Sequence, residues 1–243
     1  MESRPRFFFG VLGGATLALA AAAAAPAGDQ GAIAGAFTVN NALPEGAALE
    51  AVVLESASGR PVANQALNQE GTELPYRFQG LGAGTYKVRL IAKRAGGEMP
   101  IGETGDVELA GAAMSKEKVA APAIRSDGKL SGTVKVTGDF PPKRMVFVSA
   151  RRSDMKHKSF MPDELNSASF ELSADDVKDG TVAYRFEKLS YGVYKVQLTG
   201  YDFETHKTQT FGELPGDVVI DLDHREHAGR SFEATFAKAP AGN

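Results

Sequence analysis

Apolar and polar residues alternate in two similar ten-residue segments, residues 81–90 (LGAGTYKVRL) and residues 189–198 (LSYGVYKVQL). A period of two is typical of a β-strand with one face buried and the other exposed to solvent. The alternation therefore predicts two antiparallel strands whose aromatic and aliphatic residues point into a core. The inward-facing residues are Tyr86, Val88 and Leu90 in the first segment and Tyr194, Val196 and Leu198 in the second.

A glycine, Gly84 or Gly192, stands two residues before the tyrosine of each strand, and another alternating aromatic pair lies further upstream. The pairs Tyr76/Phe78 and Tyr184/Phe186 predict the preceding strand and a tight turn after it. Glycine is expected in the turn because it adopts backbone conformations that are costly for residues with a Cβ atom. The spacing Leu-x-x-Gly-x-Tyr is typical of a tyrosine corner, so we expect Tyr86 and Tyr194 to donate hydrogen bonds to nearby backbone.

The similarity extends toward the N-terminus. Residues 31–39 (GAIAGAFTV) match residues 128–136 (GKLSGTVKV) at an offset of 97, and the offset reaches 108 at the tyrosine strand. The second copy therefore carries 11 extra residues, which fall between Val148 and Tyr184. About seven short strands per copy, separated by frequent turn signals, predict an all-β fold of two tandem, seven-stranded, immunoglobulin-like sandwiches.

These matches predict the domain boundaries. We expect the first sandwich over residues 28–125, the second, with its insertion, over 126–238, and a tail over 239–243. Two extended segments are expected after each tyrosine strand, the first of them at 99–109 in the first copy. The link near Pro122–Gly128 is short, which favours an end-to-end arrangement with limited freedom.

The succession of strand and turn motifs resembles a known family. Gly-x-Leu-x-Gly, a proline-containing bend, Asp-Gly before Tyr-x-Phe, and Leu-x-x-Gly-x-Tyr-x-Val are similar to carboxypeptidase regulatory-like domains, which belong with transthyretin-like and Cna-B-like sandwiches. The second copy is the closer match, since residues 179–201 keep a Gly-Tyr after the strand, whereas "IAKRAGG" follows Leu90. The resemblance implies a non-catalytic accessory, stalk or binding module for carbohydrate or protein, on fold analogy alone.

The N-terminal residues predict export. Arg4 and Arg6 precede an uncharged run over residues 7–25, and small residues follow, so we expect a secretory signal peptide over 1–27, cleaved after Ala27. The alternative is an uncleaved anchor, which the Ala- and Gly-rich run disfavours. A cleaved chain would have no stable membrane anchor and would be periplasmic or secreted. The absence of cysteine leaves its stability to core packing.

The composition argues against nucleic-acid binding and against catalysis. Without Glu2, Arg4 and Arg6 the formal net charge is −4, which disfavours nucleic-acid partners. The sequence has no cysteine nucleophile, no Gly-x-Ser-x-Gly elbow and no phosphate-binding loop that leads into a helix. We therefore expect no enzymatic activity and no cofactor.

The segment 221–227 (DLDHREH) is the best metal candidate in the sequence. Its possible ligands are Asp221, Asp223, His224, Glu226 and His227. On an extended strand the two aspartates would point to one face, and His224 and Glu226 to the other, so one ion could collect them only if the chain turned sharply there. A solvated turn between the last two strands is the favoured interpretation. The alternative, a metallo-hydrolase, would retain stoichiometric metal after dialysis.

One run of positive charge, residues 143–158, is a candidate ligand surface. Its candidate binding residues are Lys143, Arg144, Arg151, Arg152, Lys156 and Lys158. The favoured interpretation is a solvated surface balanced by the acidic residues that follow. The alternative is a patch for an anionic glycan, with Tyr201 and Phe203 on one face as aromatic contacts and Tyr191 and Phe211 as further candidates. In that case Arg151→Glu with Arg152→Glu should weaken binding and leave thermal stability almost unchanged.

These observations lead to two hypotheses about function. The first is an exported, non-catalytic binding or scaffold module of the cell envelope, which contacts an envelope protein or polysaccharide through sandwich edges and end loops. The second is a polysaccharide-binding module that uses the basic run and the aromatic residues of the second copy.

Overall fold

A computed structural model of the chain describes residues 30–111, 114–141, 143–155 and 167–236. The predicted signal peptide, Lys156, Lys158 and the predicted tail lie outside these residues. Within them the regular structure is β-strand, apart from one short 3₁₀ helix, η1 (Ala174–Asp176). No helix in this part of the chain is long and apolar enough to cross a membrane.

The first sandwich packs two sheets face to face. One sheet has the order β4-β1-β8, in which β8 runs parallel to β1, and the other has the order β3-β2-β5-β6, with β7 also paired to β5. The strands are β1 (Gly31–Thr38), β2 (Ala48–Glu55), β3 (Pro61–Leu67), β4 (Glu73–Leu81), β5 (Gly84–Arg94), β6 (Gly97–Glu103), β7 (Val107–Leu109) and β8 (Ser115–Pro122).

The second sandwich repeats this arrangement. Its sheets have the orders β12-β9-β16, with β16 parallel to β9, and β11-β10-β13-β14, with β15 paired to β13. The strands are β9 (Gly128–Thr137), β10 (Arg144–Arg152), β11 (Ser167–Leu172), β12 (Thr181–Leu189), β13 (Gly192–Asp202), β14 (Lys207–Glu213), β15 (Val218–Ile220) and β16 (Glu226–Thr235). The prediction of an all-β chain with two similar sandwiches is therefore confirmed.

The alternation in the sequence corresponds to the two faces of the strands. Tyr86, Val88 and Leu90 of β5 are buried, and so are the equivalent residues of β13, while Lys195 is exposed. The Tyr86 hydroxyl donates a hydrogen bond to the Gly82 carbonyl at 3.0 Å. The Tyr194 hydroxyl donates to the Ser190 carbonyl at 2.6 Å, so both tyrosines make the backbone bond of a tyrosine corner.

Within the described residues each sandwich has eight strands, where the sequence predicted about seven. The segment expected to be one strand at residues 99–109 forms two, β6 and β7, which both pair with β5. They are separated at Thr104, whose hydroxyl accepts a hydrogen bond from the Val88 amide at 2.9 Å. This side-chain oxygen takes the hydrogen bond that the Val88 amide would otherwise donate to a backbone carbonyl, so the regular ladder is interrupted there.

The predicted reason for Gly84 and Gly192 is wrong, because neither glycine has a left-handed backbone. Their role is steric. A Cβ atom at Gly84 would lie 3.2 Å from the Tyr86 hydroxyl oxygen, and one at Gly192 would lie 2.4 Å from Nε of Arg152. The second contact is too short for real atoms, so a side chain at residue 192 would displace the guanidinium.

A second pair of glycines, in the central strands β1 and β9 of the three-stranded sheets, also allows a close approach. A Cβ atom at Gly35 would lie 1.8 Å from the Val119 carbonyl oxygen, and one at Gly132 would lie 1.6 Å from the Arg230 carbonyl oxygen. The same two carbonyls accept hydrogen bonds from Tyr76 at 2.8 Å and from Tyr184 at 2.6 Å. Each glycine lies where the pairing register of β8 or β16 shifts, so a bulge in the edge strand fits against it.

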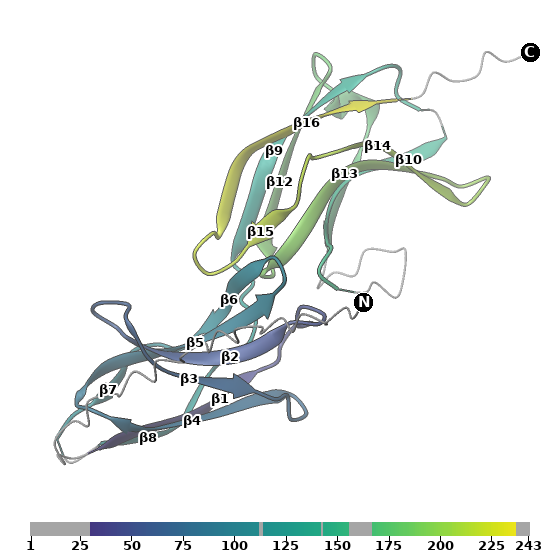
Figure 1. Cartoon of the computed structure of the whole chain (residues 1–243). Coiled ribbons are helices and arrows are strands. Elements are labelled where there is room, and N and C mark those ends of the chain that lie inside the picture. Colours follow the sequence, from purple (N-terminus) through teal and green to yellow (C-terminus); the bar gives the residue numbers. More distant parts are fainter. Residues whose placement is uncertain (1–29, 112–113, 142, 156–166, 237–243) are drawn as a thin grey trace, which may run out of the picture.

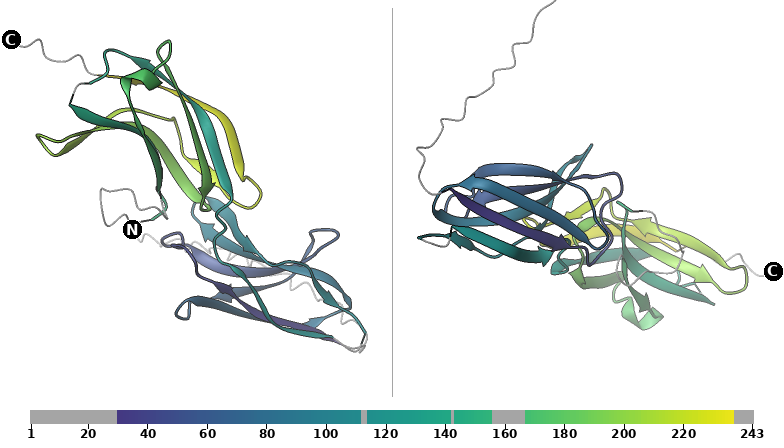
Figure 2. Two further views of the ribbon diagram at one scale, coloured as in Figure 1. Left: turned by 180° about the vertical axis from the view of Figure 1, so that it is seen from behind. Right: turned by 90° about the horizontal axis from the view of Figure 1, so that it is seen from below.

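The two sandwiches are joined end to end with a bend between them (Figure 1, Figure 2). The strand β8 ends at Pro122 and β9 starts at Gly128. In the link, Ala123 and Ile124 are fully buried. The apolar residues of both sandwiches form one contiguous cluster, so the junction is part of the core.

Candidate functional site

The far end of the second sandwich carries an open depression of about 400 Å³. We call this the tip surface; its lining residues are Lys143, Arg144, Met145, Glu171, Phe203 and Glu204. They come from the start of β10, from β11 and from the turn between β13 and β14. The structure therefore brings Lys143, Arg144 and Phe203, which the sequence singled out, to one place.

Two of the four candidate aromatic residues lie at this tip. The side chain of Phe203 is 54% exposed, and its ring packs edge-on against Tyr201 with centroids 5.3 Å apart. The Tyr201 hydroxyl shares a hydrogen bond of 3.0 Å with Nδ1 of His206. The other two candidates, Tyr191 and Phe211, are buried and have packing roles.

Two charges of the basic run, those of Lys143 and Arg144, are balanced by the hairpin of β13 and β14. Lys143 pairs with Glu204 at 3.2 Å, and Arg144 pairs with Asp202 at 3.5 Å. Arg144 also donates a hydrogen bond to Gln209. These partners belong to the hairpin of β13 and β14, not to the acidic residues that follow the run.

Arg152 does not belong to a surface patch, which corrects the assignment from sequence. Its side chain is fully buried, with Nε 2.8 Å and Nη2 3.0 Å from the two carboxylate oxygens of Asp154, whose side chain is also fully buried. Changing Arg152 to glutamate would place two carboxylates together in the interior, so the expectation of unchanged stability is wrong. Arg151, by contrast, is half-buried on β10, and in the strand register it lies opposite Lys195 of β13.

The buried ion pair of Arg152 and Asp154 lies at the junction of the two sandwiches. Nη1 of Arg152 donates to the Ala42 carbonyl of the first sandwich at 2.8 Å. The Asp154 carbonyl accepts from the Glu45 amide at 2.9 Å, and Arg94 lies 3.8 Å from the Asp154 carboxylate. Groups from both sandwiches therefore surround and contact one buried ion pair.

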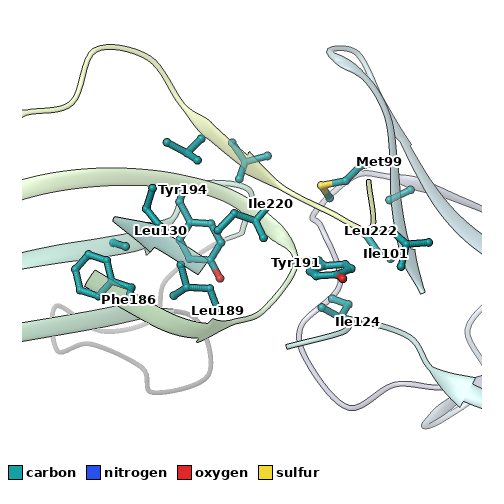
Figure 3. Close-up of a cluster of buried hydrophobic side chains, with 14 of the residues drawn as sticks. Met99, Ile101, Ile124, Leu130, Phe186, Leu189, Tyr191, Tyr194, Ile220 and Leu222 are labelled. Atoms are coloured by element: carbon teal, nitrogen blue, oxygen red, sulfur yellow. The ribbon is translucent and has the colours of Figure 1, made fainter. Parts of the chain in front are cut away.

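An apolar contact lies beside this ion pair. Figure 3 shows Tyr191 and Leu222 of the second sandwich next to Met99, Ile101 and Ile124 of the first. Tyr191 and Ile101 have no exposed surface, and the Leu222 amide donates to the Pro100 carbonyl at 2.9 Å. We call this set of contacts, together with the ion pair, the junction.

Polar groups surround the rim of the junction. Arg125 lies 2.8 Å and Arg225 3.7 Å from the same Asp127 carboxylate oxygen. Burial opposes ionisation of Asp127, but Tyr191 and the two guanidinium groups outweigh it and hold the pKa of Asp127 below its usual range. Burial and then Asp127 raise the pKa of Tyr191, although the hydroxyl and the carboxylate fall short of hydrogen-bond geometry.

The segment 221–227 forms the turn between β15 and β16. One Asp221 carboxylate oxygen accepts from the amides of Asp223 at 3.0 Å and His224 at 2.7 Å, and Nδ1 of His224 lies 3.0 Å away. His227 instead contacts the Val219 carbonyl. Among the described residues there is no group of three or more His, Cys, Asp or Glu that could hold a metal. Asp221 stabilises a turn here.

The junction was missed in the sequence, although one signal for Arg152 was present. Arg144, Val146, Val148, Ala150 and Arg152 share one face of β10, and the middle three are buried. The period of two therefore places both arginines at the ends of the core face rather than on the solvent face. The sequence gives no corresponding signal that Tyr191 packs against another domain.

Comparisons with known proteins give similarity in structure only. No protein-family model and no curated protein matches the sequence. A minor pilin of Streptococcus agalactiae is 13% identical, with a TM-score of 0.28, and the match covers 89% of this chain and 99% of that one. The fimbrial anchor protein Mfa2 from Porphyromonas gingivalis is 10% identical, with a TM-score of 0.30, over 84% of this chain and 90% of that one.

A leucine-rich repeat protein from Bacteroides thetaiotaomicron is 14% identical, with a TM-score of 0.24, over 87% of this chain. The present chain spans only 27% of the length of that protein. Similarities at this level say nothing about what the present chain binds, and its resemblance to carboxypeptidase regulatory-like domains stays a prediction.

Proposed function

We propose that the chain is an exported, non-catalytic scaffold module of the cell envelope. In this role two sandwiches act as one rigid body that presents its sheet edges and end loops to an envelope protein or polysaccharide. The junction supports the proposal most directly. A linker of ordinary flexibility would not bury a complete arginine–aspartate pair, because two buried charges are tolerated only in a well-fixed environment.

The proposal is tested by the distance between the two sandwiches. The chain has no cysteine, so Ala57→Cys and Thr208→Cys, both at exposed positions, allow one spin label to be placed in each sandwich. We expect a narrow distance distribution by pulsed electron paramagnetic resonance. Tyr191→Ala should broaden it, because it removes the aromatic ring from the junction.

Ala83 provides the matched control, since it occupies the position in the first sandwich that Tyr191 has in the second. Ala83→Tyr is expected to leave the distance distribution unchanged. A broad distance distribution in the labelled chain that keeps Tyr191 and Ala83 would contradict the rigid scaffold.

A second candidate function is polysaccharide binding at the tip surface. It is favoured by one observation, the exposed Phe203 ring beside Lys143 and Arg144. An aromatic ring supplies a flat apolar contact, and the cations supply attraction for acidic sugars.

Polygalacturonate is a suitable anionic probe for this candidate. Phe203→Ala with Lys143→Ala should weaken binding about tenfold or more, equivalent to ~1.4 kcal/mol, and added salt should weaken it further. Val219→Ala, at an exposed apolar residue away from the tip surface, serves as the control. Equal affinity of both variants would exclude the tip surface.

A further inference from the structure

The sheet edges of the two sandwiches differ in how they are protected. An edge strand has backbone groups without a strand partner, and proteins usually protect such edges with charged side chains or bulges. Among the described edge strands of more than three residues, β3 alone has no charged residue; its sequence is PVANQAL. The charged edge strands are β4, β6, β8, β11, β12, β14 and β16.

Several edges are protected by bulges or side chains; on β3 such protection is confined to its start, where Pro61 begins the strand and the register with β2 shifts at Val62. The bulge of β8 contains Lys118, and the bulge of β16 contains Gly229, each with a positive φ. On β4, the amide of Arg77 donates to the Gln65 side chain at 2.9 Å. Between Ala63 and Leu67, β3 pairs with β2 in regular antiparallel register, so its free edge is straight enough to accept another strand.

The outer face beside β3 combines apolar side chains with three charged ones, Glu50, Arg89 and Glu98. An open depression of about 480 Å³ runs over β2, β3 and β5, and its apolar lining includes Val52, Leu54, Pro61, Val62 and Ile91. Val62 is 39% exposed.

The charges at the rim of this depression are satisfied within the chain. Lys93 pairs with Glu50 at 2.6 Å and with Glu98 at 3.2 Å. Arg89 pairs with Glu103 at 2.8 Å. The Asn64 side-chain amide also donates to the Glu50 carboxylate at 2.6 Å. A partner strand would therefore meet apolar residues and charges that already have partners, without needing to supply charges of its own.

We propose that β3 is a self-association site, at which β3 of one copy pairs antiparallel with β3 of a second copy. Two identical antiparallel strands related by a two-fold axis place the residue on the axis opposite its own symmetry mate. A charged residue near the axis would face a like charge and repel it. An uncharged edge is what this pairing requires, whereas pairing with a different protein favours charges complementary to that partner.

The pairing has a natural centre at Asn64. With the axis there, Val62 of each copy lies opposite Ala66 of the other, on the same outer face. The sheets β3-β2-β5-β6 of both copies then join into one continuous sheet. This inference rests on the proposed function, since it assigns one scaffold edge to self-association, but the distance between the two sandwiches within one chain does not depend on it.

The test uses the mature chain and two substitutions at Asn64. Sedimentation over a wide concentration range is expected to show a reversible dimer. Asn64→Lys should weaken the dimer at least about tenfold, because two ammonium groups would meet at the axis. Asn64→Cys should give a disulfide-linked dimer under mild oxidation, since the chain has no other cysteine.

Ser169 on β11 provides the matched control, because it is opposite Ser149 as Asn64 is opposite Val52. Both positions are exposed, so the folded chain should tolerate either change. Ser169→Lys should leave the dimer intact, and Ser169→Cys should crosslink far less. A chain that stays monomeric, a dimer that Asn64→Lys leaves unchanged, or a β3 edge that pairs only with another protein would each overturn the proposal.

Discussion

The two sandwiches share one strand framework but differ sharply at the same end. At the end of β2, Glu55 is opposite Tyr86, and at the end of β10, Arg152 is opposite Tyr194. Glu55 pairs with Arg60, whose side chain is 69% exposed, whereas Arg152 is fully buried against the first sandwich. The repeated residues define the fold, and the residues at the strand ends determine whether that end meets water or another domain.

The largest effect on the free energy of unfolding should come from a substitution at Arg152. Arg152→Ala removes the guanidinium that bonds both oxygens of the buried Asp154 carboxylate, leaves only Arg94 at 3.8 Å, and should lower the free energy of unfolding by about 3–5 kcal/mol. Glu55→Ala, at the equivalent position, should change it little, because that pair is exposed. Guanidinium denaturation of both variants measures the comparison.

A further variant separates the loss of the ion pair from the loss of packing. Arg152→Ala with Asp154→Ala should recover part of the stability, because no unpaired charge then remains in the interior. Equal midpoints for Arg152→Ala and Glu55→Ala would mean that the junction contributes nothing to stability.

A smaller difference is expected between the two tyrosine corners. Tyr194→Phe removes a buried hydrogen bond to the Ser190 carbonyl and should cost about 1–3 kcal/mol. Tyr86→Phe removes a part-buried bond to Gly82 and should cost about 0.5–1.5 kcal/mol. Thermal unfolding of the two variants gives the order, and a larger loss for Tyr86→Phe would contradict it.

The smallest effect should appear at alkaline pH. Burial raises the pKa of Tyr184 to about 12 against a smaller opposing effect of Arg230, and burial alone raises the pKa of Tyr76 further. The unfolded chain, with tyrosine pKa values near 10, then binds fewer protons than the folded chain, so stability is complete below pH ~10 and falls above it. Each tyrosine should remove a few tenths of a kcal/mol near pH ~10.

Absorbance titration of Tyr184→Phe and Tyr76→Phe identifies which hydroxyl ionises first. Loss of the earlier step in Tyr184→Phe is the expected result. Denaturation midpoints that rise between pH 8 and 10 would contradict the direction of the effect.

The sequence predicts the framework well because the core follows local alternation. The inward residues of β5 and β13, the tyrosine corners and the tandem arrangement all follow from a period of two and one repeated motif. The number of strands was less predictable, since the same break occurs at Thr104, which has a hydroxyl, and at Leu214, which has none, so no residue type marks it. The role of Gly192 was also out of reach, because the atom that needs its space belongs to Arg152.

The functional surfaces were predicted only in part. Phe203 and Lys143 come together because their strand ends meet at one tip. Arg152 and Tyr191 were placed in a candidate surface because neither charge nor aromatic character distinguishes a solvent contact from a domain contact. The first sandwich has Glu55 and Ala83 at the equivalent positions, so the residues that the two copies share do not indicate a contact between the domains.

The parallel pairing of the first and last strands has a mechanical consequence. Gly31 starts β1 and Pro122 ends β8 at opposite ends of one parallel pair, and β9 and β16 repeat the arrangement. Tension applied along the chain would pull the two strands of each pair past each other, and it would load all of their hydrogen bonds together rather than one after another. Each sandwich with this topology therefore resists stretching, and because the two sandwiches follow each other along the chain, the chain is suited to carry force between the points it connects.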